Sequence, residues 1–208
     1  MKRIFLAILL LFCLVPSSKA QYGFLADRIT DMLTPALSGS FNYKGYVDVA
    51  YLAGLGDYNE RADILEISTS QGFNYASWCF MGVGAGVNIL FPQPAKVSYN
   101  QDVAVMVPFF TDFRFNIGKA NRVGLVIDLK VGGSILVTDE DFYIGWSCMS
   151  NSLSFYLKPS IGLRIPINKN TGKQALSVTA SYQLTTPKFA SGYNFYLHNL
   201  GATVAFEW

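Results

Sequence analysis

The chain has a single histidine, His198, and its imidazole is the side chain best suited to acid–base chemistry near neutral pH. A histidine activates a neighbouring hydroxyl or thiol nucleophile in many hydrolases. Two residues further along, where such a nucleophile would share a strand face with His198, the sequence has Leu200. We therefore interpret His198 as an interfacial histidine and expect no catalytic residue.

Three adjacent carboxylates, Asp139, Glu140 and Asp141, suggest a divalent-cation site. Calcium loops space their ligands along a loop so that the oxygens converge, whereas three consecutive side chains cannot all point inward. We expect a solvated acidic loop and no metal site. The sequence also lacks a phosphate loop, a nucleotide fingerprint and a metal-ligand cluster, so we expect no cofactor.

The first twenty residues have the pattern of a secretory signal peptide. Lys2 and Arg3 form a positive start, residues 4–15 are apolar, and Ala20 ends a small-residue cleavage site. The pattern predicts a signal peptide over residues 1–20 and export of the remainder.

The composition excludes general disorder and a nucleic-acid partner. Hydrophobic residues make up 51% of the chain, charged residues only 14%, and the mean hydropathy is +0.28. Without Lys2, Arg3 and Lys19, the 16 basic residues fall to 13 against 14 acidic ones, so the signal peptide accounts for the pI of 8.4. No stretch after residue 16 is apolar enough for a membrane helix. A heavily buried all-β domain and a membrane β-barrel remain.

From residue 41 onward, apolar and polar side chains alternate with the period of two that is typical of strands. In 123–137 the apolar side chains take the odd positions, and Asp128 and Lys130 take even ones. The pattern predicts eight strands in one domain, at 41–52, 63–73, 76–91, 103–117, 123–137, 153–165, 174–186 and 194–208. Three prolines within them cannot donate a ladder hydrogen bond and indicate bulges or misplaced strand ends: Pro108, Pro159 and Pro166.

The expected connections alternate between long and short, as they do in outer-membrane barrels. The short ones are 74–75, 118–121 and 167–173, and the long ones are 53–62, 92–101, 138–150 and 187–193. A soluble β-sandwich also alternates and is the competing interpretation. The polar face carries both charge signs, which favours a barrel with an ionic lumen: Lys44, Asp48, Glu66, Asp112, Arg114, Asp128, Lys130, Lys158 and Arg164. Aromatic residues near strand ends fit interfacial girdles: Tyr43, Tyr51, Phe91, Phe113, Phe115, Tyr193 and Phe195.

Residues 200–208 alternate and end on Trp208. With the signal peptide and the loop alternation, the chain resembles small eight-stranded outer-membrane barrels of the OmpA/OmpX-like group. Residues 21–24 and 199–201 look like those of porin-family barrels of Bacteroidetes-type bacteria. The resemblance implies an all-β, antiparallel, up-and-down transmembrane barrel over 41–208, located in the bacterial outer membrane. It also implies outer-membrane lipid, lipopolysaccharide and, through the C-terminal strand, the assembly machinery as partners.

The sequence also allows predictions for the segment that precedes the barrel and for the two cysteines outside the signal peptide. Residues 21–40 include apolar side chains at helical spacing before Pro35, so they form either a short amphipathic helix or a frayed leader. Cys79 and Cys148 are predicted at opposite ends of the barrel, so we expect no disulfide between them within one chain.

The predicted lumen face of strand 76–91 carries glycine at three alternate positions: Gly82, Gly84 and Gly86. Aromatic side chains from facing strands fill this space in one interpretation, and a small cavity remains in the other; the candidates to fill it are Tyr46, Phe110 and Tyr156. An eight-stranded barrel is only just wide enough for its own side chains, so we expect no wide pore.

We predict a non-enzymatic outer-membrane barrel with a structural, surface-interaction or adhesion role. A narrow channel or small-ligand transporter is the alternative. A lipid-modifying enzyme comes third, because lipid A deacylases place a histidine and a serine two residues apart, where this chain has His198 and Leu200.

Overall fold

The computed structural model describes residues 42–56, 61–76, 78–92, 103–137, 142–144, 147–149, 153–167, 174–187 and 196–208. The predicted signal peptide, the segment 21–40, the acidic run 139–141, Tyr193 and Phe195 lie outside the described residues. Within the described part, every regular element is a strand. No helix in that part is long and apolar enough to cross a membrane.

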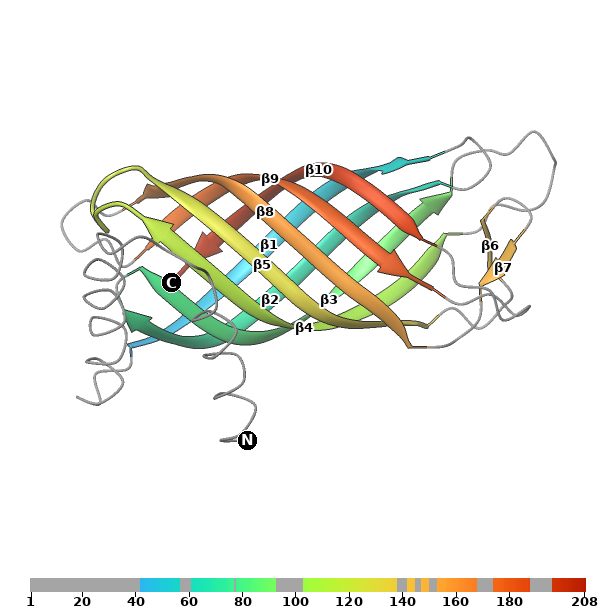
Figure 1. Cartoon of the computed structure of the whole chain (residues 1–208), viewed down its shortest axis with the longest axis horizontal. Helices are drawn as coiled ribbons and strands as arrows, with labels where there is room; N and C mark the ends of the chain where they lie inside the picture. The colour runs from blue at the N-terminus through green and yellow to red at the C-terminus, as the bar shows by residue number, and fades with distance from the viewer. Residues whose placement is uncertain are drawn as a thin grey trace, which may run out of the picture. The chain divides into compact units, whose positions relative to one another are not determined.

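Eight strands form one closed antiparallel barrel, in which β1 pairs with β10 (Figure 1). This confirms the predicted fold class. The strands are β1 (Asn42–Leu55), β2 (Ala62–Ala76), β3 (Cys79–Pro92), β4 (Ala104–Ile117), β5 (Gly124–Leu136), β8 (Ser154–Pro166), β9 (Ala175–Thr186) and β10 (Leu197–Glu207).

A small separate hairpin, β6 (Phe142–Ile144) with β7 (Ser147–Met149), lies in the connection between β5 and β8. The sequence pattern predicts a loop over this stretch. Strands of three residues are too short to show a period of two, which is why the pattern missed them.

The connections alternate between two ends of the barrel, as predicted. We call the end with connections 77–78, 118–123 and 167–174 the short-turn end. The opposite end, with connections 56–61, 93–103, 137–153 and 187–196, is the long-loop end.

The register of the paired strands sets the tilt of the barrel. A path of directly paired residues leaves β1 at Gly45 and returns to β1 at Leu55, ten residues further along; it passes through Gln71, Val83, Thr111, Val131, Leu157, Leu184 and His198. Ten residues span about 33 Å along a strand, and eight strand spacings span about 38 Å around the wall. The strands therefore tilt by about 40° to the barrel axis, which is common in such barrels.

The predicted faces are confirmed along the strands. On β9 and β10, inward residues are buried and outward apolar residues are exposed in strict alternation over most of each strand. Two outward threonines, Thr69 and Thr111, donate their hydroxyl groups to the backbone carbonyls of Tyr46 and Val131, at 2.9 and 3.0 Å. These bonds satisfy the hydroxyl donors on a face that is otherwise largely apolar.

The three strand prolines do not mark bulges, so that interpretation was wrong. Pro108 sits opposite Ser134 in β5, and the β3–β4 register is the same on both sides of it. Pro159 is likewise in register with β5, and Pro166 ends β8. A proline removes one hydrogen-bond donor but adds no extra residue to the strand. The pairing with the neighbouring strand is therefore weaker at that residue, while the register continues past it. The ladder of β2 with β3 instead shows a register shift, between Asn74 and Ala76.

Candidate functional site

The lumen contains a cluster of buried charges that we call the central ion network: Asp48, Glu66, Asp112, Arg114, Asp128, Lys130 and Lys158. Arg114 on β4 bridges two carboxylates. Its guanidinium lies 2.5 Å from an Asp48 carboxylate oxygen and 2.8 Å from one of Asp112. A planar guanidinium can donate along several directions at once, which suits it to this position.

Two lysines extend the network toward the long-loop end. Lys130 Nζ lies 2.5 Å from Asp48 and donates to Ser68 Oγ at 3.1 Å. Lys158 Nζ lies 2.8 Å from Glu66, which also accepts a hydrogen bond from the Tyr156 hydroxyl at 2.9 Å. Both ammonium groups are fully buried, so these partners replace the water that each charge loses on folding.

A second charged group, which we call the seam cluster, joins Lys44, Arg164 and Glu207 at the short-turn end. Arg164 donates twice to the Glu207 carboxylate, at 2.7 and 2.9 Å, and Lys44 pairs with the same carboxylate. The two clusters together hold five basic and five acidic side chains. The basic and acidic side chains are thus equal in number, which allows most of the buried charges to be paired.

Aromatic rings pack between the ions and fill the space beside the lumen glycines. The Arg114 guanidinium carbon lies 3.9 Å from the Tyr46 ring centroid, and Lys130 Nζ lies 4.8 Å from that of Phe110. A Cβ added at Gly84 would lie 2.5 Å from the Phe110 ring, which stacks on Tyr156. At Gly84 the predicted filling by an aromatic residue is therefore correct.

The lumen at the long-loop end contains a cluster of buried apolar side chains that the alternation pattern did not reveal. We call this group the apolar plug: Ala50, Leu52, Ala62, Ile64, Leu90, Ala104, Met106, Leu136 and Leu197. Its members lie on the lumen face of six strands. Near these strand ends the sequence has apolar residues on both faces, and this loss of alternation was the available signal. At the same end, β8 and β9 contribute buried polar side chains to the lumen: Ser154, Gln183 and Thr185.

The seam between β1 and β10 is closed on both faces. Trp208 exchanges two backbone hydrogen bonds with Gly45, at 3.1 and 3.2 Å, and its indole covers Gly45 on the outer face. A Cβ at Gly45 would lie 2.4 Å from the indole, so only glycine permits this approach. On the inner face, Lys44 and Glu207 form the ion pair of the seam cluster.

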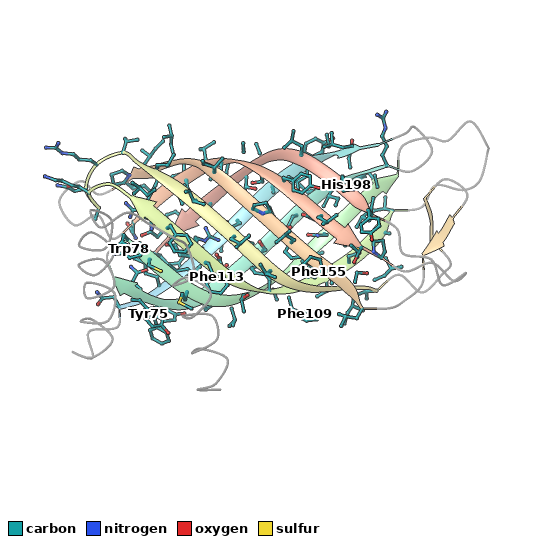
Figure 2. The ribbon with its side chains drawn as sticks, in the orientation of Figure 1. Tyr75, Trp78, Phe109, Phe113, Phe155 and His198 are labelled. Atoms are coloured by element: carbon teal, nitrogen blue, oxygen red, sulfur yellow. The ribbon has the colours of Figure 1, made fainter. Side chains whose placement is uncertain are left out.

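The outward face carries large apolar residues over all eight strands, with aromatic rings toward both ends. Figure 2 shows Tyr75 and Trp78 near the short-turn end, and Phe109, Phe155 and His198 toward the long-loop end. Such girdles are typical of barrels at the two membrane–water interfaces.

His198 lies on the outward side of β10 together with the exposed Leu200, as predicted. Its Nδ1 lies 2.5 Å from the Tyr182 hydroxyl, and its ring stacks with Tyr196 at a centroid distance of 6.4 Å. These contacts give His198 the surroundings of an interfacial aromatic residue.

The remaining candidate residues form no site in the part of the chain that the structure describes. That part holds no group of three potential metal-ligating side chains. Cys79 is buried with a free thiol at the start of β3, at the short-turn end, whereas β7, which contains Cys148, lies in a connection of the long-loop end.

A closed barrel with an apolar outer face, aromatic girdles and a charged interior is a transmembrane β-barrel. Its eight antiparallel strands place it in the class of small outer-membrane barrels. No family model and no curated protein matches the chain.

Solved structures that are similar to this chain include two proteins with surface or outer-membrane names. The crystal structure of Neisserial surface protein A (NspA) has 12% sequence identity and a TM-score of 0.47, and the match covers 78% of this chain and 95% of that one. The backbone structure of the Yersinia pestis outer membrane protein Ail in a phospholipid bilayer nanodisc has 13% identity and a TM-score of 0.43, over 79% and 100% of the two chains.

Proposed function

We propose that this protein is a non-conducting outer-membrane barrel that acts as a structural scaffold for surface interactions. The observation that carries the proposal is the occupied lumen: the central ion network lies in its middle, and the apolar plug packs at the long-loop end. A lumen occupied in this way favours a rigid scaffold over a path for solutes. Its interacting parts are then the connections at the long-loop end.

The channel alternative requires a continuous polar path through the lumen. Gly84 faces the Phe110 ring, and plug residues such as Leu52 and Leu90 are fully buried. These contacts favour a closed barrel over a small-ligand transporter.

A lipid-modifying enzyme would need a nucleophile beside His198 on the outer face. The position two residues along is the exposed Leu200, and the nearest polar partner is the Tyr182 hydroxyl. A tyrosine hydroxyl bonded to an imidazole suits an interfacial anchor, since both rings keep a polar tip near water. We therefore propose a non-enzymatic role.

Conductance in planar lipid bilayers tests the proposal. The barrel, shown to be folded by its heat-modifiable migration in gels, is expected to give no discrete current steps at moderate voltages. Regular steps that recur in independent preparations would establish the channel instead.

The surface role has its own test. We expect that replacing residues 138–150 with a short turn leaves folding intact but reduces attachment of whole cells to purified lipopolysaccharide or to host-cell surfaces. A matched exchange at the short-turn end, in 118–121, is expected to leave attachment unchanged. Equal attachment by both variants and the parent protein would refute the role of the long-loop end.

A further inference from the structure

A groove of about 440 Å³ opens at the short-turn end, beside the turn between β4 and β5 and the end of β8. It is lined by Asn121, Arg122, Val123, Ile165 and Pro166. None of these residues belongs to the central ion network or the seam cluster. The groove is therefore a feature of the surface that the scaffold role leaves unexplained.

The groove combines two kinds of surface. Val123 and Ile165, which are 59% and 42% exposed, continue the outward apolar columns of β5 and β8. Asn121 and Arg122 are exposed polar residues on the turn that follows β4. The groove thus lies where the apolar outer face gives way to the polar turns, at the level of a membrane–water interface.

The turn that carries the polar groups is held in place from within the barrel. Arg164 of the seam cluster donates to the carbonyl oxygen of Ala120 at 2.9 Å, and the Arg122 amide donates to the Lys119 carbonyl at 3.0 Å. Gly118 begins the turn with a φ of 135°, a value that favours glycine. The side chains of Lys119 and Arg122 therefore project from a fixed backbone, and the turn contains no carboxylate to neutralise them.

We propose that this groove binds an anionic phospholipid of the leaflet at the short-turn end. Outer-membrane barrels have their short turns on the periplasmic side, so this is the periplasmic leaflet. The lipid phosphate would pair with the Arg122 guanidinium, whose parallel N–H groups match two phosphate oxygens. Asn121 would donate a further hydrogen bond, and the first acyl carbons would lie on Val123 and Ile165. Lys119 adds a second positive charge at the surface.

The charge and the apolar lining select this occupant. A zwitterionic lipid brings a choline or amine cation close to two basic side chains, whereas an anionic lipid brings a net negative charge. A water-soluble anion would leave the apolar lining exposed. The inference rests on the chain spanning a membrane, which the fold establishes as its class, and not on the scaffold role.

Native mass spectrometry of the folded barrel tests the inference. Equal amounts of phosphatidylglycerol and phosphatidylcholine are added to the barrel in detergent micelles, and the lipids retained on the protein are counted. The parent protein is expected to retain phosphatidylglycerol preferentially. Arg122→Gln is expected to lower that retention about fivefold, which corresponds to the roughly 1 kcal/mol contributed by one basic residue at an anionic membrane surface. Retention of phosphatidylcholine is expected to stay the same.

Arg61→Gln at the long-loop end is the matched control, because it removes the same charge far from the groove. Heat-modifiable migration of each variant is measured first, so that a folding defect is separated from a binding defect. Equal retention of the two lipids by the parent, or equal losses in Arg122→Gln and Arg61→Gln, would overturn the inference. So would displacement of phosphatidylglycerol by equimolar soluble glycerol phosphate, since the site would then bind an anion rather than a lipid.

Discussion

Arg114 is the residue whose removal should most disturb the lumen. Its guanidinium contacts Asp48 at 2.5 Å and Asp112 at 2.8 Å, and it lies 3.9 Å from Asp128. Arg114→Met keeps an unbranched, flexible side chain, although a shorter one, and removes the charge and every donor. Three buried carboxylates would then depend mainly on Lys130, which lies 2.5 Å from Asp48.

The expected cost follows from the loss of a buried partner. Breaking a buried ion pair by removing one member costs about 3–5 kcal/mol, because the remaining charge is left without compensation. The contact with the Tyr46 ring adds a further contribution of about 1 kcal/mol. We therefore expect Arg114→Met to lower the free energy of unfolding by at least about 3 kcal/mol.

Reversible urea unfolding in detergent micelles, followed by tryptophan fluorescence, measures this loss. Adding Asp112→Asn to Arg114→Met removes one uncompensated charge, so the double variant is expected to recover part of the loss. Lys119→Met removes an exposed charge and should change stability by no more than about 0.5 kcal/mol. If Arg114→Met forms the closed barrel and loses less than about 1 kcal/mol, the central ion network does not stabilise the fold as argued.

Three further predictions concern the seam, the outer face and the plug. Gly45→Val is expected to reduce the yield of heat-modifiable barrel, because the added Cβ overlaps the Trp208 indole. Trp208→Ala in the same chain should restore part of that yield, and no rescue would mean that another contact is responsible. Leu129→Lys should destabilise the barrel by about 2–4 kcal/mol in micelle unfolding, whereas Leu129→Phe should be nearly neutral. Equal effects of the two substitutions would mean that this face does not contact lipid. Leu90→Ala should lower the free energy of unfolding by about 2–5 kcal/mol in the same assay, as in the core of a soluble protein. A much smaller loss would mean that the plug is loosely packed.

The sequence alone determined which face of each strand points into the lumen and which points outward. Alternation is a local property, because successive side chains on a strand point to opposite sides, so Asp128 and Lys130 could be assigned to the lumen without knowing any neighbour. The same pattern located the eight barrel strands to within a few residues, and the outward position of His198 followed from its parity with Leu200.

The tertiary structure decided the partners. Arg114 meets Asp48 from 66 positions away only because the register returns to β1 ten residues along and tilts the strands by about 40°. The apolar plug needed the same information, since side chains from six strands become one cluster only when their heights in the barrel are known. Register depends on how all eight strands pair and close together at Gly45 and Trp208, and no local pattern contains that non-local condition.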